Sequence, residues 1–285
     1  MTRPILQAIL AIALLSAMDA AIKALVARLP VWEVTFLRYL VGSAWMLALL
    51  AWARPARPSG EALKANLVRA VVVVVTATSF FYALGELPLA ETLVLSFISP
   101  ACTALLAALL LGERPDRKVL GALAAGFAGV LVIAAGGLEY GTVDGPPKTG
   151  SLLGVSAVIV AAIGYSASNV LLRARARHDP VVTIVAIQNI APALILAPPA
   201  AHVWVAPGAT DWPLIGLVGT LGVAGHLILA QAYAAEEATR LAPLDYTALV
   251  WAVLFGTLVF GEVPGPAVWL GGALIIGSAW RVGRR

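Results

Sequence analysis

The sequence has 285 residues, of which 61% are hydrophobic and 12% are charged, and its mean hydropathy is +0.93. Soluble domains are roughly half apolar and about a quarter charged, so this composition excludes a soluble globular protein and indicates a membrane protein. The net charge is +4, but the basic residues are spread over several short segments and do not form one patch for nucleic acid.

Apolar stretches follow one another along almost the whole chain. A helix needs about 20 mostly apolar residues to cross a bilayer. Ten stretches are of this kind: 5–28, 31–52, 67–85, 89–111, 118–137, 150–172, 181–204, 213–235, 241–260 and 265–281. Strict alternation of apolar and polar residues is absent, which argues against a β-barrel. The sequence therefore predicts an all-α integral membrane protein with ten transmembrane helices.

The basic residues indicate how these helices are oriented. With ten spans, fifteen of the nineteen Lys and Arg residues fall on one face of the membrane, which is expected to be cytoplasmic. These residues are Arg3, Arg54, Arg57, Lys64, Arg69, Arg114, Arg117, Lys118, Arg173, Arg175, Arg177, Arg240, Arg281, Arg284 and Arg285. Both termini are therefore predicted to be cytoplasmic.

The first helix contains two charges, in the stretch SAMDAAIKALVARLPV (16–31). Asp19 and Lys23 are four residues apart and share one helix face, and Arg38 is expected at similar depth in the second helix. Each charge at mid-helix costs about 2.5–3.5 kcal/mol on insertion scales. Two interpretations stay open: an internal ion pair that fixes helix packing, or groups that face a cavity and meet a zwitterion or a coupling proton.

Four hydroxyl side chains recur on one face of the fourth helix, at intervals of four, three and four residues. They are Thr92, Ser96, Ser99 and Thr103. Such a stripe can line a watery cavity, which we favour, or bond to neighbouring helices and its own backbone. Pro100 beside the stripe predicts a helix kink and a free carbonyl near mid-membrane that an ammonium group can bind.

Aromatic side chains near the membrane centre are candidates for a surface on which an aromatic solute stacks. Tyr82 shares a face with Thr78 in the third helix, and Tyr165 lies in the sixth. Trp251 lies near the middle of the ninth helix, with Tyr246 nearby. Aromatic residues in helices more often serve packing, by roughly three to one. We favour a binding role for Trp251 because it is central.

Three polar side chains in the later helices are further candidates. Asn169 follows Tyr165 by one helical turn, and Gln188 in the seventh helix can hold either a carboxylate or a partner helix. His226 in the eighth helix is a candidate proton carrier, because imidazole gains and loses a proton near neutral pH. A hydrogen-bonded structural histidine is the competing interpretation.

Motifs of several other function classes are missing from the sequence. It has no Walker A pattern, no H-E-x-x-H, no G-x-S-x-G and a single cysteine, Cys102. We therefore expect no direct use of ATP, no enzyme activity, no metal site and no cofactor. The alternatives to amino-acid export are a carrier for another metabolite or drug, a membrane-embedded enzyme and a channel. Hydrolysis of a lipid or peptide would indicate an enzyme, and single-channel currents would indicate a channel.

The chain repeats itself. SAMDAAIKALVARLPV (16–31) aligns without gaps on SASNVLLRARARHDPV (166–181), and LGERP (111–115) matches FGEVP (260–264) at a spacing changed by one residue. Because each half has five predicted helices, an odd number, the halves are expected to be inserted in opposite directions, as in many secondary transporters. The predicted units are a first repeat 1–137, a linker loop 138–149 and a second repeat 150–285.

Ten helices in two halves and a G-E-x-P at the end of the fourth helix of each half resemble the EamA-type family of the drug/metabolite transporter superfamily. The resemblance implies helices around a central cavity, a bacterial inner-membrane location, and export of small metabolites, with aromatic and neutral amino acids the first candidates. It implies a small-molecule substrate and a lipid bilayer as the partners, no nucleic acid, and a monomer, with a dimer as the alternative.

Overall fold

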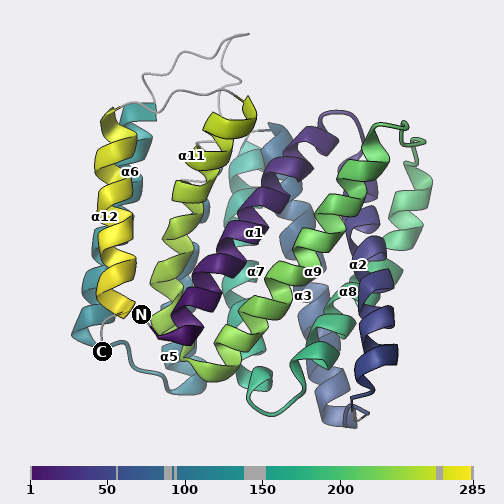
Figure 1. Ribbon diagram of the computed structural model, residues 1–285, viewed down its shortest axis with the longest axis horizontal. Helices are drawn as coiled ribbons and strands as arrows, with labels where there is room; N and C mark the ends of the chain where they lie inside the picture. The colour runs from purple at the N-terminus through teal and green to yellow at the C-terminus, as the bar shows by residue number, and fades with distance from the viewer. Residues whose placement is uncertain are drawn as a thin grey trace.

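The computed structural model describes residues 2–55, 57–86, 92, 95–137, 152–260 and 266–283, and every regular element in these ranges is helical. The elements, shown in Figure 1, are α1 (Arg3–Val26), α2 (Val31–Ala53), α3 (Gly60–Glu86), α5 (Ser99–Leu111), α6 (Arg117–Gly137), α7 (Leu152–Ala176), α8 (Val181–His202), α9 (Asp211–Ala235), α10 (Ala238–Leu241), the 3₁₀ helix η1 (Ala242–Tyr246), α11 (Thr247–Phe260) and α12 (Pro266–Gly283). The predicted linker 138–149 and the FGEVP motif beyond Phe260 lie outside the described residues.

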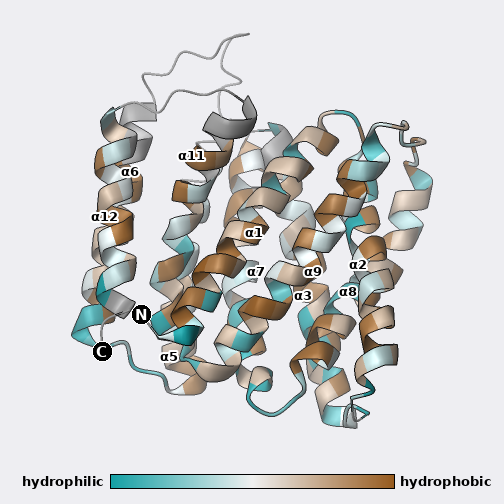
Figure 2. Ribbon diagram, viewed as in Figure 1, coloured by the Kyte–Doolittle hydropathy of each residue, from teal (hydrophilic) through white to brown (hydrophobic). Residues whose placement is uncertain are grey.

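Six of these helices are long and apolar enough to cross a bilayer: α1, α2, α3, α7, α8 and α9. Large apolar side chains also cover much of the outer surface; Trp52 is 82% exposed and Leu109 is 71% exposed. Figure 2 shows hydrophobic residues along the lengths of the helices, with many of the hydrophilic ones near their ends and in the loops. This surface is the one expected where lipid tails replace water. That ten helices cross the membrane stays a prediction.

The main helix pairs join the two halves of the chain. α1 packs chiefly on α9, α2 on α8, α3 on α7 and α6 on α12. In Figure 1, α6 and α12 stand side by side at one edge of the bundle, and α1 begins at the end of the bundle where α12 finishes. The largest cluster of buried apolar residues is likewise shared, with Ile5 and Met46 from the first half and Ile184 and Tyr233 from the second.

Close approach of α9 to the first two helices depends on glycine. A Cβ atom at Gly225 would lie 2.8 Å from the Leu15 side chain of α1, and one at Gly219 would collide with Val41 of α2. These glycines therefore allow backbones to come together at the contact, as small residues do in membrane helix interfaces.

The structure differs from the sequence prediction at the start of three helices. α3 begins at Gly60, so Arg69, grouped above with the cytoplasmic charges, lies well inside the helix and is 3% exposed. The chain turns at Phe97 and Ile98, and Pro100 then occupies the first turn of α5, where a missing amide hydrogen costs nothing. The predicted helix 241–260 is divided between η1 and α11.

Candidate functional site

A cavity of about 220 Å³ lies inside the bundle, between the two halves of the chain. α1, α2 and α3 contribute to its wall from the first half, and α7, α8, α9 and η1 contribute from the second. Most of the wall is apolar, and it includes the rings of Phe80, Phe81 and Phe97.

Four charged residues line this cavity, two basic and two acidic: Arg38, Arg69, Asp19 and Asp245. Ionisable groups at membrane depth are costly and mark solute or ion pathways when they face an internal space. The balance of signs fits a solute that carries charge of both signs.

Arg69 is held by α7 and still has binding capacity left. Its Nε atom donates to the carbonyl oxygen of Ser168 at 3.1 Å and lies 3.2 Å from the Ser168 hydroxyl. Its Nη1 atom is buried and has no hydrogen-bond partner in the part of the chain that the structure describes. A guanidinium has five N–H donors, so Arg69 can donate hydrogen bonds to a bound carboxylate and still keep its contacts to α7.

Asp245 lies in the short η1 helix, and only one of its two carboxylate oxygen atoms accepts a hydrogen bond from the described residues. The Tyr165 hydroxyl donates to its Oδ1 atom at 3.3 Å. Its Oδ2 atom is buried without a hydrogen-bond partner among the described residues, and the residue is 7% exposed. A buried carboxylate oxygen without a donor is expensive, and an ammonium group of a solute can satisfy it.

Arg38 and Asp19 form the other charged part of the wall. The Arg38 Nε atom lies 3.1 Å from the sulfur of Met18, the residue that precedes Asp19. The positive charge of Arg38 interacts electrostatically with the Asp19 carboxyl group. Lys23, one turn further along α1, is not among the residues that line this cavity. An ion pair between Asp19 and Lys23 stays a prediction.

Six other sequence-predicted candidates line the cavity wall: Ser96, Ser99, Tyr165, Asn169, Gln188 and His226. The His226 Nδ1 atom donates to the carbonyl oxygen of Gly222 at 2.6 Å, which leaves Nε2 as the second nitrogen of the ring. Asn169 lies beside the Tyr165 hydroxyl.

The remaining predicted candidates are not among the residues that line this cavity. Thr78 donates to the Val74 carbonyl of its own helix at 2.7 Å, and Tyr82 is 39% exposed on the outside. Thr103 is fully buried, Tyr246 packs its ring against Phe97, and Trp251 packs against the largest apolar cluster.

Sequence reasoning missed two of the four charged residues of the wall. Arg69 could have been found from the helix start, because the Ser59 hydroxyl accepts the Ala62 amide at 3.1 Å and so acts as a cap just before α3. Asp245 is the single acid in the apolar stretch LAPLDYTALV, and this isolated charge is the sequence signal that marks it. Ser168, Thr76 and Tyr39 also line the cavity without having been predicted.

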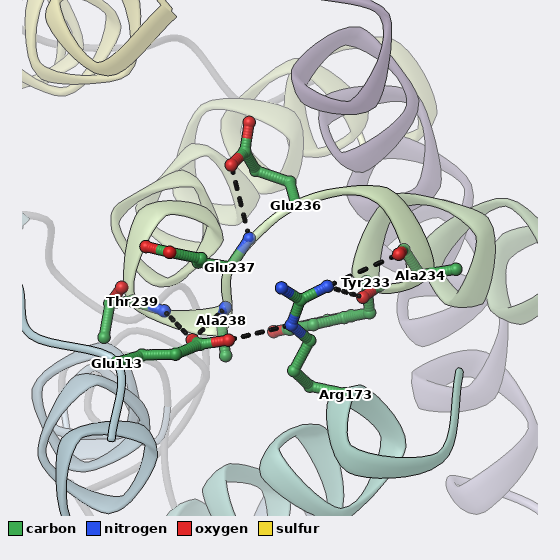
Figure 3. Close-up of polar contacts among 8 residues, drawn as sticks. All are labelled: Glu113, Arg173, Tyr233, Ala234, Glu236, Glu237, Ala238 and Thr239. Carbon is green, nitrogen blue, oxygen red and sulfur yellow. Dashed lines mark hydrogen bonds and ion pairs between the residues drawn. The ribbon is translucent and has the colours of Figure 1, made fainter. Parts of the chain in front are cut away.

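A second polar cluster, which we call the Glu113 cluster, lies where α5, α7 and the junction of α9 and α10 meet (Figure 3). Arg173 of α7 donates from Nε to Glu113 Oε1 at 2.8 Å and from Nη1 to the Tyr233 carbonyl at 2.7 Å. Glu113 Oε2 accepts the amides of Ala238 at 2.7 Å and Thr239 at 3.3 Å. The cluster ties the end of α5 to α7 and to the junction between α9 and α10.

The hydroxyl stripe can be tested at Ser99, which lines the cavity. Ser99→Leu is expected to reduce transport at least severalfold, because the larger apolar side chain fills part of the cavity and removes a hydroxyl. Transport in vesicles, normalised to the amount of inserted protein, measures this. Thr78→Leu, away from the cavity in α3, is the control; equal losses in both variants would contradict a role for the Ser99 face.

An apolar helical bundle with charged residues along an internal cavity is the architecture expected of a membrane transporter of small molecules. The chain belongs to the EamA-like transporter family, whose family model matches residues 2–135 and again residues 152–283. The protein is accordingly a multi-pass membrane protein.

Individual relatives cover most of the chain. It is 29% identical to the pseudopaline exporter CntI of Pseudomonas aeruginosa strain PAO1, over 95% of this chain and 93% of the relative. It is 24% identical to the S-adenosylmethionine uptake transporter of Rickettsia prowazekii, over 90% and 84% of the two chains. It is 29% identical to the riboflavin transporter of Brucella anthropi, over 86% and 85%. A crystal structure with 23% identity has the same fold, with a TM-score of 0.78 over 99% of this chain and 95% of the other.

Proposed function

We propose that the protein is a secondary transporter that exports small metabolites, with aromatic and neutral amino acids as the first candidates, across a bacterial inner membrane. The observation that carries the proposal is the cavity wall, which combines Arg69, Asp245 and three phenylalanine rings. An amino acid presents a carboxylate and an ammonium group, and an aromatic one adds a ring that packs on phenylalanine.

Alternating access between two inverted repeats, 1–137 and 150–285, is the proposed mechanism, with 138–149 as the linker. The helix pairs support it. α1 and α7 are the first helices of the two proposed repeats, and α3 and α9 are the third, so the pair α1–α9 is repeated as the pair α7–α3. A cavity between such halves can open to either side as they rock against each other.

The proposed orientation has both termini in the cytoplasm, as the basic residues predict. The carrier is proposed to work as a monomer without a cofactor and without a nucleic-acid partner. His226 and Asp19, which face the cavity, are the candidates for a coupled proton.

The relatives' names support transport of metabolites but differ in solute and in direction. The Pseudomonas relative is named an exporter and the Rickettsia relative an uptake transporter. Export is therefore the proposal that the Pseudomonas relative and the family resemblance favour, and the direction has to be measured.

Purified protein in liposomes is expected to transport labelled phenylalanine, tryptophan or leucine faster than protein-free liposomes do. A panel of all twenty amino acids, with and without a pH gradient, identifies the solute and the coupling together. Acceleration by the gradient would indicate proton coupling, and equal rates would indicate facilitated diffusion. If none of the twenty amino acids is transported, the amino-acid assignment is overturned.

A further inference from the structure

The charged groups of the cavity differ in how much binding capacity they have left. Arg38 and Asp19 act on each other, and Arg38 also lies over the Tyr39 ring with its guanidinium carbon 4.4 Å from the ring centre. Arg69 Nη1 and Asp245 Oδ2 are buried and have no hydrogen-bond partner within the described ranges. Buried polar atoms are nearly always satisfied, so two of opposite sign in one cavity point to a ligand with the complementary pair.

α7 holds both of these groups by hydrogen bonds. Arg69 is bonded to Ser168 and Asp245 is bonded to Tyr165, and these residues are three apart on the same helix. At 1.5 Å of rise per residue, their positions differ by about 4.5 Å along the axis of α7, and both lie on one face. Ser168 and Tyr165 of α7 therefore anchor the basic and the acidic group on the same side of the cavity.

We infer that Arg69 binds the carboxylate of the transported solute and that Asp245 binds its ammonium group, with Ser168 and Tyr165 of α7 holding the two side chains in place. This assignment rests on the proposed function and deepens it. The side chain of the solute then lies against the apolar part of the wall, which includes Phe80, Phe81 and Phe97.

The two ends can be tested separately with three probes that share a phenyl ring. Phenylalanine has both charged groups, phenethylamine lacks the carboxylate, and 3-phenylpropionate lacks the ammonium group. Binding to purified protein is measured by calorimetry, and inhibition of phenylalanine transport in proteoliposomes is measured alongside it.

Asp245→Asn is expected to weaken the binding of phenylalanine and of phenethylamine about tenfold or more, because one charge-assisted hydrogen bond to the ammonium group is lost. The binding of 3-phenylpropionate is expected to weaken by less than about twofold. Arg69→Gln is expected to give the reverse pattern: the binding of phenylalanine and of 3-phenylpropionate weakens, and the binding of phenethylamine changes little. Arg69→Lys keeps the charge and tests the same end if the glutamine variant does not fold. Glu61→Gln removes an exposed carboxylate that does not line the cavity and is the matched control; it is expected to leave the binding of all three probes unchanged.

The outcomes separate the assignment from the proposed function. If the wild type transports phenylalanine but the Asp245 and Arg69 variants weaken all three probes equally, the assignment is overturned and the function stands. If the two variants show the opposite selectivity, the ends of the solute are reversed and the assignment is again overturned. If the wild type neither binds nor transports phenylalanine or any other amino acid of the panel, the proposed amino-acid function fails, and the assignment fails with it.

Discussion

Glu113→Ala is expected to be one of the most destabilising single substitutions in this chain. It leaves the buried Arg173 guanidinium without its counter-charge and removes the acceptor of the Ala238 and Thr239 amides. Breaking a buried ion pair from one side costs about 3–5 kcal/mol. Denaturant titration in detergent micelles, followed by tryptophan fluorescence, measures the loss in free energy of unfolding.

A matched pair of controls separates burial from charge. Glu61 also pairs with an arginine, Arg175 at 2.8 Å, but its side chain is 84% exposed, so Glu61→Ala is expected to cost less than about 1 kcal/mol. Glu113→Gln keeps an acceptor for the Ala238 amide and is expected to fall between the two. Equal stability of the Glu113→Ala and Glu61→Ala variants would show that the Glu113 cluster adds nothing beyond an exposed ion pair.

Gly129→Leu is expected to separate α6 from α12 and to lower the yield of folded protein strongly. A Cβ atom at Gly129 would lie 2.7 Å from the carbonyl oxygen of Gly271 and 2.8 Å from the Ile275 side chain. A backbone atom cannot move aside as a flexible side chain can, so even alanine forces the helices apart. Overpacking of this kind costs about 1–3 kcal/mol or more. Fluorescence-detected size-exclusion chromatography and thermal unfolding measure it.

Gly121, in the same helix, is the control for the effect of replacing a glycine where no neighbouring helix lies close. It has no atom within 4 Å of the position that a Cβ would take, so Gly121→Ala is expected to be neutral or slightly stabilising. Alanine is favoured over glycine in a helix by about 1 kcal/mol. A Gly129→Ala variant as stable as Gly121→Ala would contradict the close contact between α6 and α12.

The class of fold could be predicted because composition and helix length follow directly from the solvent that surrounds the chain. The site could be predicted only in part. Asp19 and Arg38 were found because a charge inside an apolar stretch is conspicuous, and both line the cavity. Arg69 lies near enough to the basic loop residues to be read as one of them, and only the helix start at Gly60 places it inside.

A binding role for Trp251 was predicted from its depth along a helix, and that role stays a prediction. Its central place in the sequence stretch favoured the cavity, but the side chain packs against the largest apolar cluster. Depth follows from counting residues, whereas the direction of a side chain around the helix axis depends on how neighbouring helices pack. Asp245 escaped notice for a related reason, because the 3₁₀ helix that carries it interrupts what reads as one continuous span.

The pairing of α1 with α9 and of α3 with α7 has a consequence for how the protein is made. While the ribosome is still translating the first half, α1 and α3 lack their main packing partners, because α9 begins 208 residues after the start of α1 and α7 begins 92 residues after the start of α3. Early helices must wait in the lipid, or beside the insertion machinery, until synthesis is well advanced. A fragment that stops after the fifth predicted helix would consequently be a target for membrane proteases, and co-expression of the missing half should rescue it.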